Sequence, residues 1–207
     1  MKYEWKKSEK ELYLPKAVPT LITVPKMKYF TISGKGDPNH SQEFQDKIGV
    51  LYSMAYAIRM MPKSGFTPDG YFEYTVYPLE GIWSFDEVGQ KTTTFNKDNF
   101  VYKLMIRQPD FVSEALFRKA LENTKVKKPN LLLDEVKFEE IEDGLCVQML
   151  HLGAYDDEPK TFQQMQKFID DYDYQKRSLE HREIYLSDFT KTSPEKLKTV
   201  LRYFVQK

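Results

Sequence analysis

Near the C-terminus, three side chains capable of acid–base chemistry occupy every second position. Residues His181–Asp188 read HREIYLSD, and alternate residues of a β-strand lie on the same face. His181, Glu183 and Tyr185 would therefore share one face, while apolar residues of the other face enter the core. If the first face lines a cleft, the Glu183 carboxylate can act on water as a general base, or hold a cation beside aromatic rings. The plainer interpretation places Glu183 on an open face, paired with a surface cation.

A second candidate segment, Tyr77–Trp83, reads YPLEGIW. Gly81 would let the backbone bend, so that Glu80 and Trp83 both reach a pocket just past the end of a strand. A β-turn explains Glu80 and Gly81 equally well, and Trp83 could instead fill a core.

The sequence lacks the residue patterns that other kinds of site need. The segment Gly34–Asn39, GKGDPN, has neither the Lys-Ser/Thr ending of a phosphate-binding loop nor a third Gly, so we interpret it as a turn. His40, His151 and His181 lack metal-ligand spacing. Cys146 is the only cysteine, which excludes an intrachain disulfide, and it lies in an apolar run typical of packing. We therefore expect no metal and no cofactor.

Charge and hydropathy limit the partners. Lys plus Arg and Asp plus Glu both total 31, so the net charge is zero, and direct nucleic-acid binding is not expected. No run approaches the roughly 18 apolar residues that a membrane span needs, and the N-terminus lacks the apolar segment of a signal peptide. These features predict a cytoplasmic protein that does not enter a membrane. The oligomeric state is left open.

The elements that must position these residues follow a pattern written twice. Residues 30–45 read FTISGKGDPNHSQEFQ, and residues 149–163 read MLHLGAYDDEPKTFQ. Each copy has an apolar run, a Gly, a turn bearing Asp and Pro, and Phe-Gln at the start of a helical stretch. Two copies of a strand–helix unit suggest a pseudo-symmetric domain with a cleft where the halves meet.

Local sequence signals predict the remaining elements around the first copy. Residues 1–25 are polar and punctuated by Pro, so we expect an extended lead-in rather than a helix. Ser41 can cap a helix whose apolar residues recur at steps of three and four as far as Pro62. Strands are predicted at 26–33, 71–83 and 99–107.

A linking helix at 111–125, capped by Asp110, leads to the second copy. Asp143-Gly144 predicts a hairpin turn between strands at 137–142 and 145–152. The next helix is expected to bury Phe162, Met165, Ile169 and Tyr172. The remaining predicted elements are a strand at 181–186, one helical turn at 193–195 and a closing strand at 199–205.

These elements predict an α+β fold, with antiparallel sheets formed by two pseudo-twofold βαββ repeats around a central cleft and helices on the outside. We expect one domain over residues 1–207. Its parts are the lead-in 1–25, repeat one at about 26–108, the linking helix at about 110–126 and repeat two at about 132–207.

Four segments together resemble the GyrI-like small-molecule-binding proteins. They are KSEKELYLPKAVPTLITVPKMKYFTISGKGDPN, PLEGIW, LHLGAYDDEPKTFQQM and HREIYLSDFTKTSPEKLKTVLR, and the resemblance covers nearly the whole chain. It implies two βαββ units around a cleft, a fold also used by effector domains of multidrug-responsive transcription activators. No helix-turn-helix precedes the domain, so we expect a stand-alone form rather than a transcription factor.

The resemblance also implies roles for residues. In the effector domains a Glu on the strand matching HREIYLSD meets cationic drugs at the floor of an aromatic pocket, and this role carries over to Glu183. Stand-alone members include hydrolases that open the cyclopropane of DNA-alkylating cyclopropanoid toxins, where Glu183 would be the general base. Tyr185 would hydrogen-bond water or substrate as the second catalytic residue. The ligand-binding residues would be Trp83 and Tyr155 as aromatic walls, Glu80 as a second acid near the mouth, and His181.

Three functions remain open at this stage. The first is a hydrolase acting on strained electrophilic aromatic toxins. The second is a non-catalytic protein that sequesters lipophilic cationic drugs with the same carboxylate. The third is a DNA gyrase-interacting inhibitor, for which the zero net charge argues against direct DNA contact.

Overall fold

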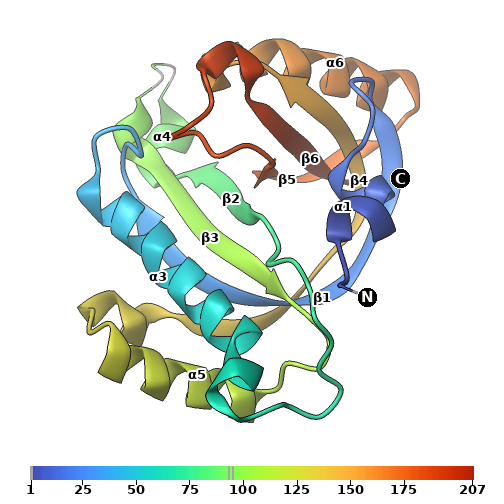
Figure 1. Cartoon of the computed structure of the whole chain (residues 1–207). Helices are drawn as coiled ribbons and strands as arrows, with labels where there is room; N and C mark the ends of the chain where they lie inside the picture. The colour runs from blue at the N-terminus through green and yellow to red at the C-terminus, as the bar shows by residue number, and fades with distance from the viewer. Residues whose placement is uncertain (1, 93, 95) are drawn as a thin grey trace. The chain divides into compact units, whose positions relative to one another are not determined.

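The computed structural model describes residues 2–92, 94 and 96–207 and has an α+β fold (Figure 1). Its strands are β1 (Thr20–Lys35), β2 (Leu79–Phe85), β3 (Phe100–Gln108), β4 (Lys137–Leu152), β5 (Gln175–Tyr185) and β6 (Lys198–Gln206). Its α-helices are α1 (Trp5–Ser8), α2 (Lys10–Tyr13), α3 (Gln42–Arg59), α4 (Glu87–Lys91), α5 (Glu114–Lys127) and α6 (Glu158–Asp171). Short 3-10 helices are η1 (Met61–Ser64), η2 (Lys97–Asn99), η3 (Leu131–Glu135), η4 (Tyr155–Asp157) and η5 (Pro194–Lys196).

The chain divides into two compact units. The first unit contains residues 1–4, 27–79 and 85–141, and the second contains residues 5–26, 80–84 and 142–207. The order strand–helix–strand–strand occurs twice along the chain, in β1, α3, β2, β3 and in β4, α6, β5, β6. The predicted α+β class is thus confirmed, while the pseudo-twofold relation, the central cleft and the single domain stay predictions.

In the first unit, α3 lies along β3 and beside α5 (Figure 1). The helix begins where predicted, because the Ser41 hydroxyl accepts a hydrogen bond from the Phe44 N–H at 3.1 Å. Its apolar stripe, which includes Leu51 and Ile58, is buried. Strand β3 pairs antiparallel with the second half of β1.

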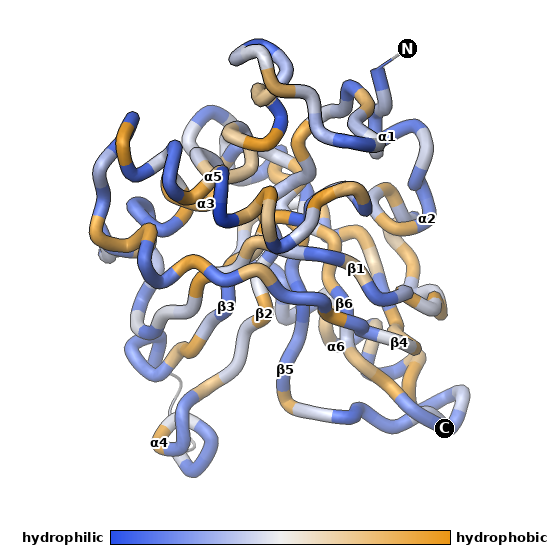
Figure 2. Tube along the Cα trace, turned by 90° about the horizontal axis from the view of Figure 1, so that it is seen from below, coloured by the Kyte–Doolittle hydropathy of each residue, from blue (hydrophilic) through white to orange (hydrophobic). Residues whose placement is uncertain are grey.

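In the second unit, four strands form an antiparallel sheet in the order β2–β5–β6–β4. Directly paired residues share a face of a sheet. On one face, which we call the helix-covered face, apolar residues of β4 and β6 pack against α6. This core comprises Val147, Met149, Met165, Ile169, Leu201 and Val205. Figure 2 shows that β5, by contrast, is predominantly hydrophilic.

The opposite face of this sheet, the arginine face, buries two arginines that lie directly across from each other. Arg182 is 0% exposed and donates hydrogen bonds to Glu80 Oε2 at 2.8 Å and to Asp143 Oδ1 at 2.6 Å. Arg202 donates from Nε to Gln148 Oε1 at 2.9 Å. Buried arginines need such partners, since an unpaired buried charge is strongly destabilising.

The lead-in differs from the sequence-based expectation. It forms α1 and α2, and β1 already begins at Thr20. The rings of Trp5 and Tyr13 are both buried and lie 5.0 Å apart, so tertiary packing folds a segment that is polar on average. That packing is invisible to local propensity.

The predicted hairpin at Asp143-Gly144 is also wrong. Strand β4 continues from Lys137 to Leu152, although Gly144 has the left-handed φ of 65° that the turn signal anticipates. The Asp143 side chain enters the buried ion pair with Arg182 instead of facing water at a turn.

Several predicted boundaries shift. Ser113, rather than Asp110, caps α5 by accepting from the Leu116 N–H. Of the predicted strand 71–83, only the residues from Leu79 onward are regular strand, and β2 extends to Phe85. Tyr172 is 58% exposed because α6 ends at Asp171, one residue before it. Among the described residues, no helix combines the length and hydropathy needed to cross a membrane.

Candidate functional site

A chain of hydrogen bonds on the helix-covered face of the second unit joins β2 to β5. Trp83 Nε1–H donates to the Tyr185 hydroxyl at 2.8 Å, and that hydroxyl donates to Glu183 Oε2 at 2.7 Å. His181 Nε2 lies 2.9 Å from Glu183 Oε1 in a further hydrogen bond. Strand alternation places His181, Glu183 and Tyr185 on one face, as predicted, and the β2–β5 register sets Trp83 opposite His181. We call these four residues the Glu183 network.

Gly81 makes room for this network. It pairs with Glu183 across the two strands, and its missing side chain leaves space for the Trp83 indole. A Cβ atom at Gly81 would lie 2.6 Å from Trp83 Nε1, closer than real contacts allow. The sequence suggested that Gly81 bends the backbone, whereas the structure assigns it this steric role.

Aromatic rings surround the network. The Tyr155 ring, from η4, meets the Tyr185 ring edge-on with centroids 6.0 Å apart. Phe162 of α6 lies 4.8 Å from the His181 ring and 5.1 Å from the Tyr203 ring. Burial, reinforced by the negative charge of Glu183, raises the pKa of Tyr185 and of Tyr155 well above 10. Both hydroxyls therefore stay protonated near neutral pH.

A second carboxyl group, that of Glu158, interacts electrostatically with Glu183. It lies in the first turn of α6, is 7% exposed, and its Oε1 has no hydrogen-bond partner among the described residues. Burial, followed by the charge of Glu183, raises the pKa of Glu158 to about 10. The Glu158 carboxyl is thus neutral at pH 7.

Sequence reasoning missed Glu158. A Glu in the first turn of a helix normally interacts favourably with the helix dipole while exposed to solvent. Neither its residue type nor its position therefore predicted that Glu158 is buried. Its closeness along the chain to Tyr155, which was predicted as a pocket wall, was the available clue.

His151 holds the η4 turn in place. Its Nδ1 lies 2.8 Å from the Thr161 hydroxyl of α6, and its Nε2 lies 2.9 Å from the Ala154 carbonyl oxygen. Both ring nitrogens of this buried histidine are therefore engaged. The histidine connects β4 to the segment that carries Tyr155 and Glu158.

The predicted site residues separate into two groups. Trp83, Tyr155, His181, Glu183 and Tyr185 come together, and their roles in catalysis or binding remain predictions. Glu183 is 9% exposed with tyrosine and histidine partners, so the interpretation that placed it on an open face is wrong.

Glu80 lies elsewhere. The prediction of an acid near a pocket mouth is wrong, because Glu80 is 1% exposed and pairs with Arg182 on the arginine face. In the register, Glu80 lies across from Ile184, one position away from the Gly81–Glu183 pair. Strand alternation therefore turns it to the other side of the sheet.

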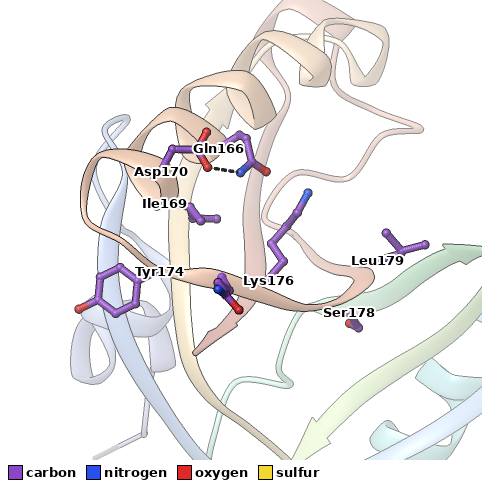
Figure 3. Close-up of a pocket in the computed structure, with 8 residues that line it drawn as sticks. Gln166, Ile169, Asp170, Tyr174, Lys176, Ser178 and Leu179 are labelled. Atoms are coloured by element: carbon purple, nitrogen blue, oxygen red, sulfur yellow. Dashed lines mark hydrogen bonds between the residues drawn. The ribbon is translucent and has the colours of Figure 1, made fainter. Parts of the chain in front are cut away.

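A surface hollow of about 480 Å³ lies between α6 and the first residues of β5 (Figure 3). Gln166 and Asp170 hydrogen-bond to each other along its rim at 2.8 Å. None of the predicted site residues lines it. Its polar groups are those of a solvated surface.

Residues 18–205 match the family model of the GyrI-like small molecule binding domain. The chain belongs to the GyrI-like family. No curated protein matches it.

Solved structures extend the comparison. A protein from Listeria innocua described as a hydrolase is 37% identical to this GyrI-like chain, with a TM-score of 0.89 over 99% of this chain and 100% of that one. An uncharacterized conserved protein from Listeria innocua is 38% identical, with a TM-score of 0.91 over 99% and 100% of the two chains. The EcmrR C-terminal domain is 14% identical, with a TM-score of 0.53 over 91% of this chain and 97% of that domain, and shares the fold.

Proposed function

We propose that this GyrI-like protein is a hydrolase that adds water to a strained, electrophilic aromatic small molecule of the cyclopropanoid class. The observation that carries the proposal is a nearly buried Glu183 carboxylate, hydrogen-bonded by Tyr185 and His181 among aromatic rings. The Listeria innocua protein described as a hydrolase, 37% identical over nearly the whole chain, supports the reaction class.

Glu183 would act on a water molecule. Each carboxylate oxygen can accept about two hydrogen bonds, so the bonds from Tyr185 and His181 leave acceptor capacity on both oxygens. As the water oxygen bonds to the electrophilic ring carbon, Glu183 accepts a water proton. The strained carbon–carbon bond breaks, and its electron pair passes into the conjugated system of the substrate.

Tyr185 and Trp83 would keep Glu183 in position for this step. The indole N–H donates to the Tyr185 oxygen, which directs the hydroxyl proton toward the carboxylate. Because burial holds the pKa of Tyr185 well above 10, the hydroxyl remains a donor throughout the neutral range. The rings of Trp83 and Tyr155 would bind the flat faces of an aromatic substrate and exclude bulk water.

The second candidate function is capture of lipophilic cations without chemistry. The same carboxylate among ring faces would attract a positive charge, and the family model describes small-molecule binding. A binding site is common to both candidates, so the two differ only in whether water is added.

Mass spectrometry after incubation with a cyclopropanoid substrate tests the hydrolase. The expected result is a product heavier by one water, with turnover lowered about 10²- to 10⁴-fold in Glu183→Gln, the range for loss of a general base. Glu180→Gln, an exposed acid on the same strand, is the matched control and should leave turnover unchanged.

Equal turnover by Glu183→Gln, or no product from the unmodified protein, would contradict the hydrolase. Thermal unfolding in the presence of a cationic dye tests the second candidate function. A dye at 100 times its Kd should stabilise the fold by about 2.7 kcal/mol. Stabilisation without product, lost in Glu183→Gln, would favour capture.

A further inference from the structure

Glu158 is a buried carboxyl group of the second unit that the proposed reaction has not yet used. Glu158 is more than nine-tenths buried, and its Oε1 has no hydrogen-bond partner among the described residues. Buried polar groups are normally satisfied, because an unpaired one costs free energy. A residue that weakens the fold in this way needs another explanation, and function at a site is the common one.

The surroundings of Glu158 favour its neutral form. The titratable groups that interact with it are Glu183 and Tyr185 from β5, and Tyr155 and Asp156 from η4. None of these is a cation. His151 on β4 directs its ring nitrogens to Thr161 and Ala154.

The position of Glu158 complements that of Glu183. One carboxyl comes from the first turn of α6 and the other from β5. The charge of Glu183 adds to burial in raising the pKa values of Glu158, Tyr155 and Tyr185. Paired carboxyl groups can serve as an acid and a base in one site.

Resting on the proposed hydrolysis, we propose that Glu158 is the general acid of the same site, donating its proton to the substrate oxygen on which negative charge develops. Water bonds to the ring carbon, Glu183 takes one water proton, and the ring carbon–carbon bond breaks. The released electron pair moves through the conjugated ring to a carbonyl oxygen, which takes the proton of Glu158 and becomes a hydroxyl. A proton passing from Glu183 to solvent and another from solvent to Glu158 restore both groups.

This role defines the substrate class more closely. A proton donor helps only when the leaving electrons end on a basic atom, so the strained ring must be conjugated to a carbonyl oxygen. A cationic ligand without such an oxygen would gain nothing from a neutral Glu158. The site therefore suits a neutral, carbonyl-conjugated electrophile better than a lipophilic cation.

The test is the pH dependence of kcat for the unmodified protein, Glu158→Gln, Glu183→Gln and the Glu180→Gln control. A general acid works only while protonated, so kcat of the unmodified protein should fall as pH rises through the pKa of Glu158, near 10. Glu158→Gln keeps the size of the side chain and cannot transfer a proton. It should lower kcat about 10²- to 10⁴-fold and abolish this alkaline fall.

Two further measurements separate a proton donor from a structural residue. The infrared C=O stretch of a protonated carboxyl should be present at neutral pH and lost in Glu158→Gln. The midpoint of thermal unfolding should not fall in this variant, because Gln removes no hydrogen bond of Oε1.

The outcomes distinguish the two proposals. Absence of turnover by the unmodified protein overturns the hydrolase and this inference with it. If the protein turns over and Glu183→Gln does not, an active Glu158→Gln with an unchanged alkaline limb overturns the role of Glu158 alone. A missing protonated-carboxyl band at neutral pH also overturns it.

Discussion

At the scale of single residues, the site depends on which groups around Glu183 hold a proton. Tyr185 and Tyr155 keep theirs because burial and a nearby negative charge both disfavour the phenolate. Glu158 keeps its proton for the same two reasons. Tyr185 donates its proton to the Glu183 carboxylate in a hydrogen bond, while Tyr155 and Glu158 interact with that carboxylate electrostatically.

Tyr185→Phe tests the link between Trp83 and Glu183. The change removes one hydrogen bond to the carboxylate and leaves the Trp83 N–H without the Tyr185 oxygen. We expect turnover to fall about tenfold or more and unfolding free energy to fall by about 1–3 kcal/mol. Kinetics and chemical denaturation measure both, with the exposed Tyr56→Phe as control. Unchanged turnover would mean that Tyr185 does not position Glu183.

At the scale of elements, the strands β2 and β5 place acid–base and aromatic side chains on one face of a sheet and buried ion pairs on the other. Strand β5 presents His181, Glu183 and Tyr185 to the helix-covered face and Arg182 to the arginine face. The side-chain period of two makes this separation unavoidable once the register is set. Strand β2 shows the same separation, with Trp83 on one face and Glu80 on the other.

Gly81→Ala tests the contact between these strands. The added Cβ would overlap the Trp83 indole, so the ring must move and its hydrogen bond to Tyr185 should break. We expect a loss of about 1–3 kcal/mol in unfolding free energy from overpacking, together with a changed tryptophan fluorescence spectrum.

The matched control is Gly49→Ala in α3, where nothing lies within 4 Å of the new Cβ. It should stabilise the protein by about 0.8–1 kcal/mol through helix propensity. If Gly81→Ala behaves like Gly49→Ala, the steric role of Gly81 is refuted.

At the scale of the whole molecule, zero net charge conceals an uneven distribution of charges. Many ion pairs are exposed, such as Arg118–Glu114, and contribute little. The pairs of Arg182 with Glu80 and Asp143 are buried, and their stability depends on all three partners. Composition counts these charges alike, whereas burial makes their energetic consequences very different.

Arg182→Met should therefore destabilise the protein strongly. It leaves Glu80 and Asp143 buried without their cation, a loss of about 3–5 kcal/mol in unfolding free energy. Arg118→Met, which breaks the exposed pair in α5, should cost about 0.5 kcal/mol or less. Urea denaturation measures both variants. Equal losses of unfolding free energy in the two variants would show that the buried ion pairs stabilise the protein no more than the exposed pair.

Much of the local structure followed from local rules. Ser41 capped α3, the period of α3 identified its buried stripe, and strand alternation placed His181, Glu183 and Tyr185 on one face. These features depend on neighbours within a few positions, so sequence suffices for them. The errors at residues 1–25 and at Asp143 arose where distant packing overrode local preference.

The sequence by itself determined the family, the α+β class and the face on which Glu183 lies. Only the tertiary structure decided that Trp83 bonds to Tyr185, that Arg182 pairs with Glu80, and that Glu158 is buried within electrostatic range of Glu183. The first two contacts join residues 102 positions apart. Alternation along one strand determines a face, but register between strands and burial under a helix determine partners and protonation, and both are non-local.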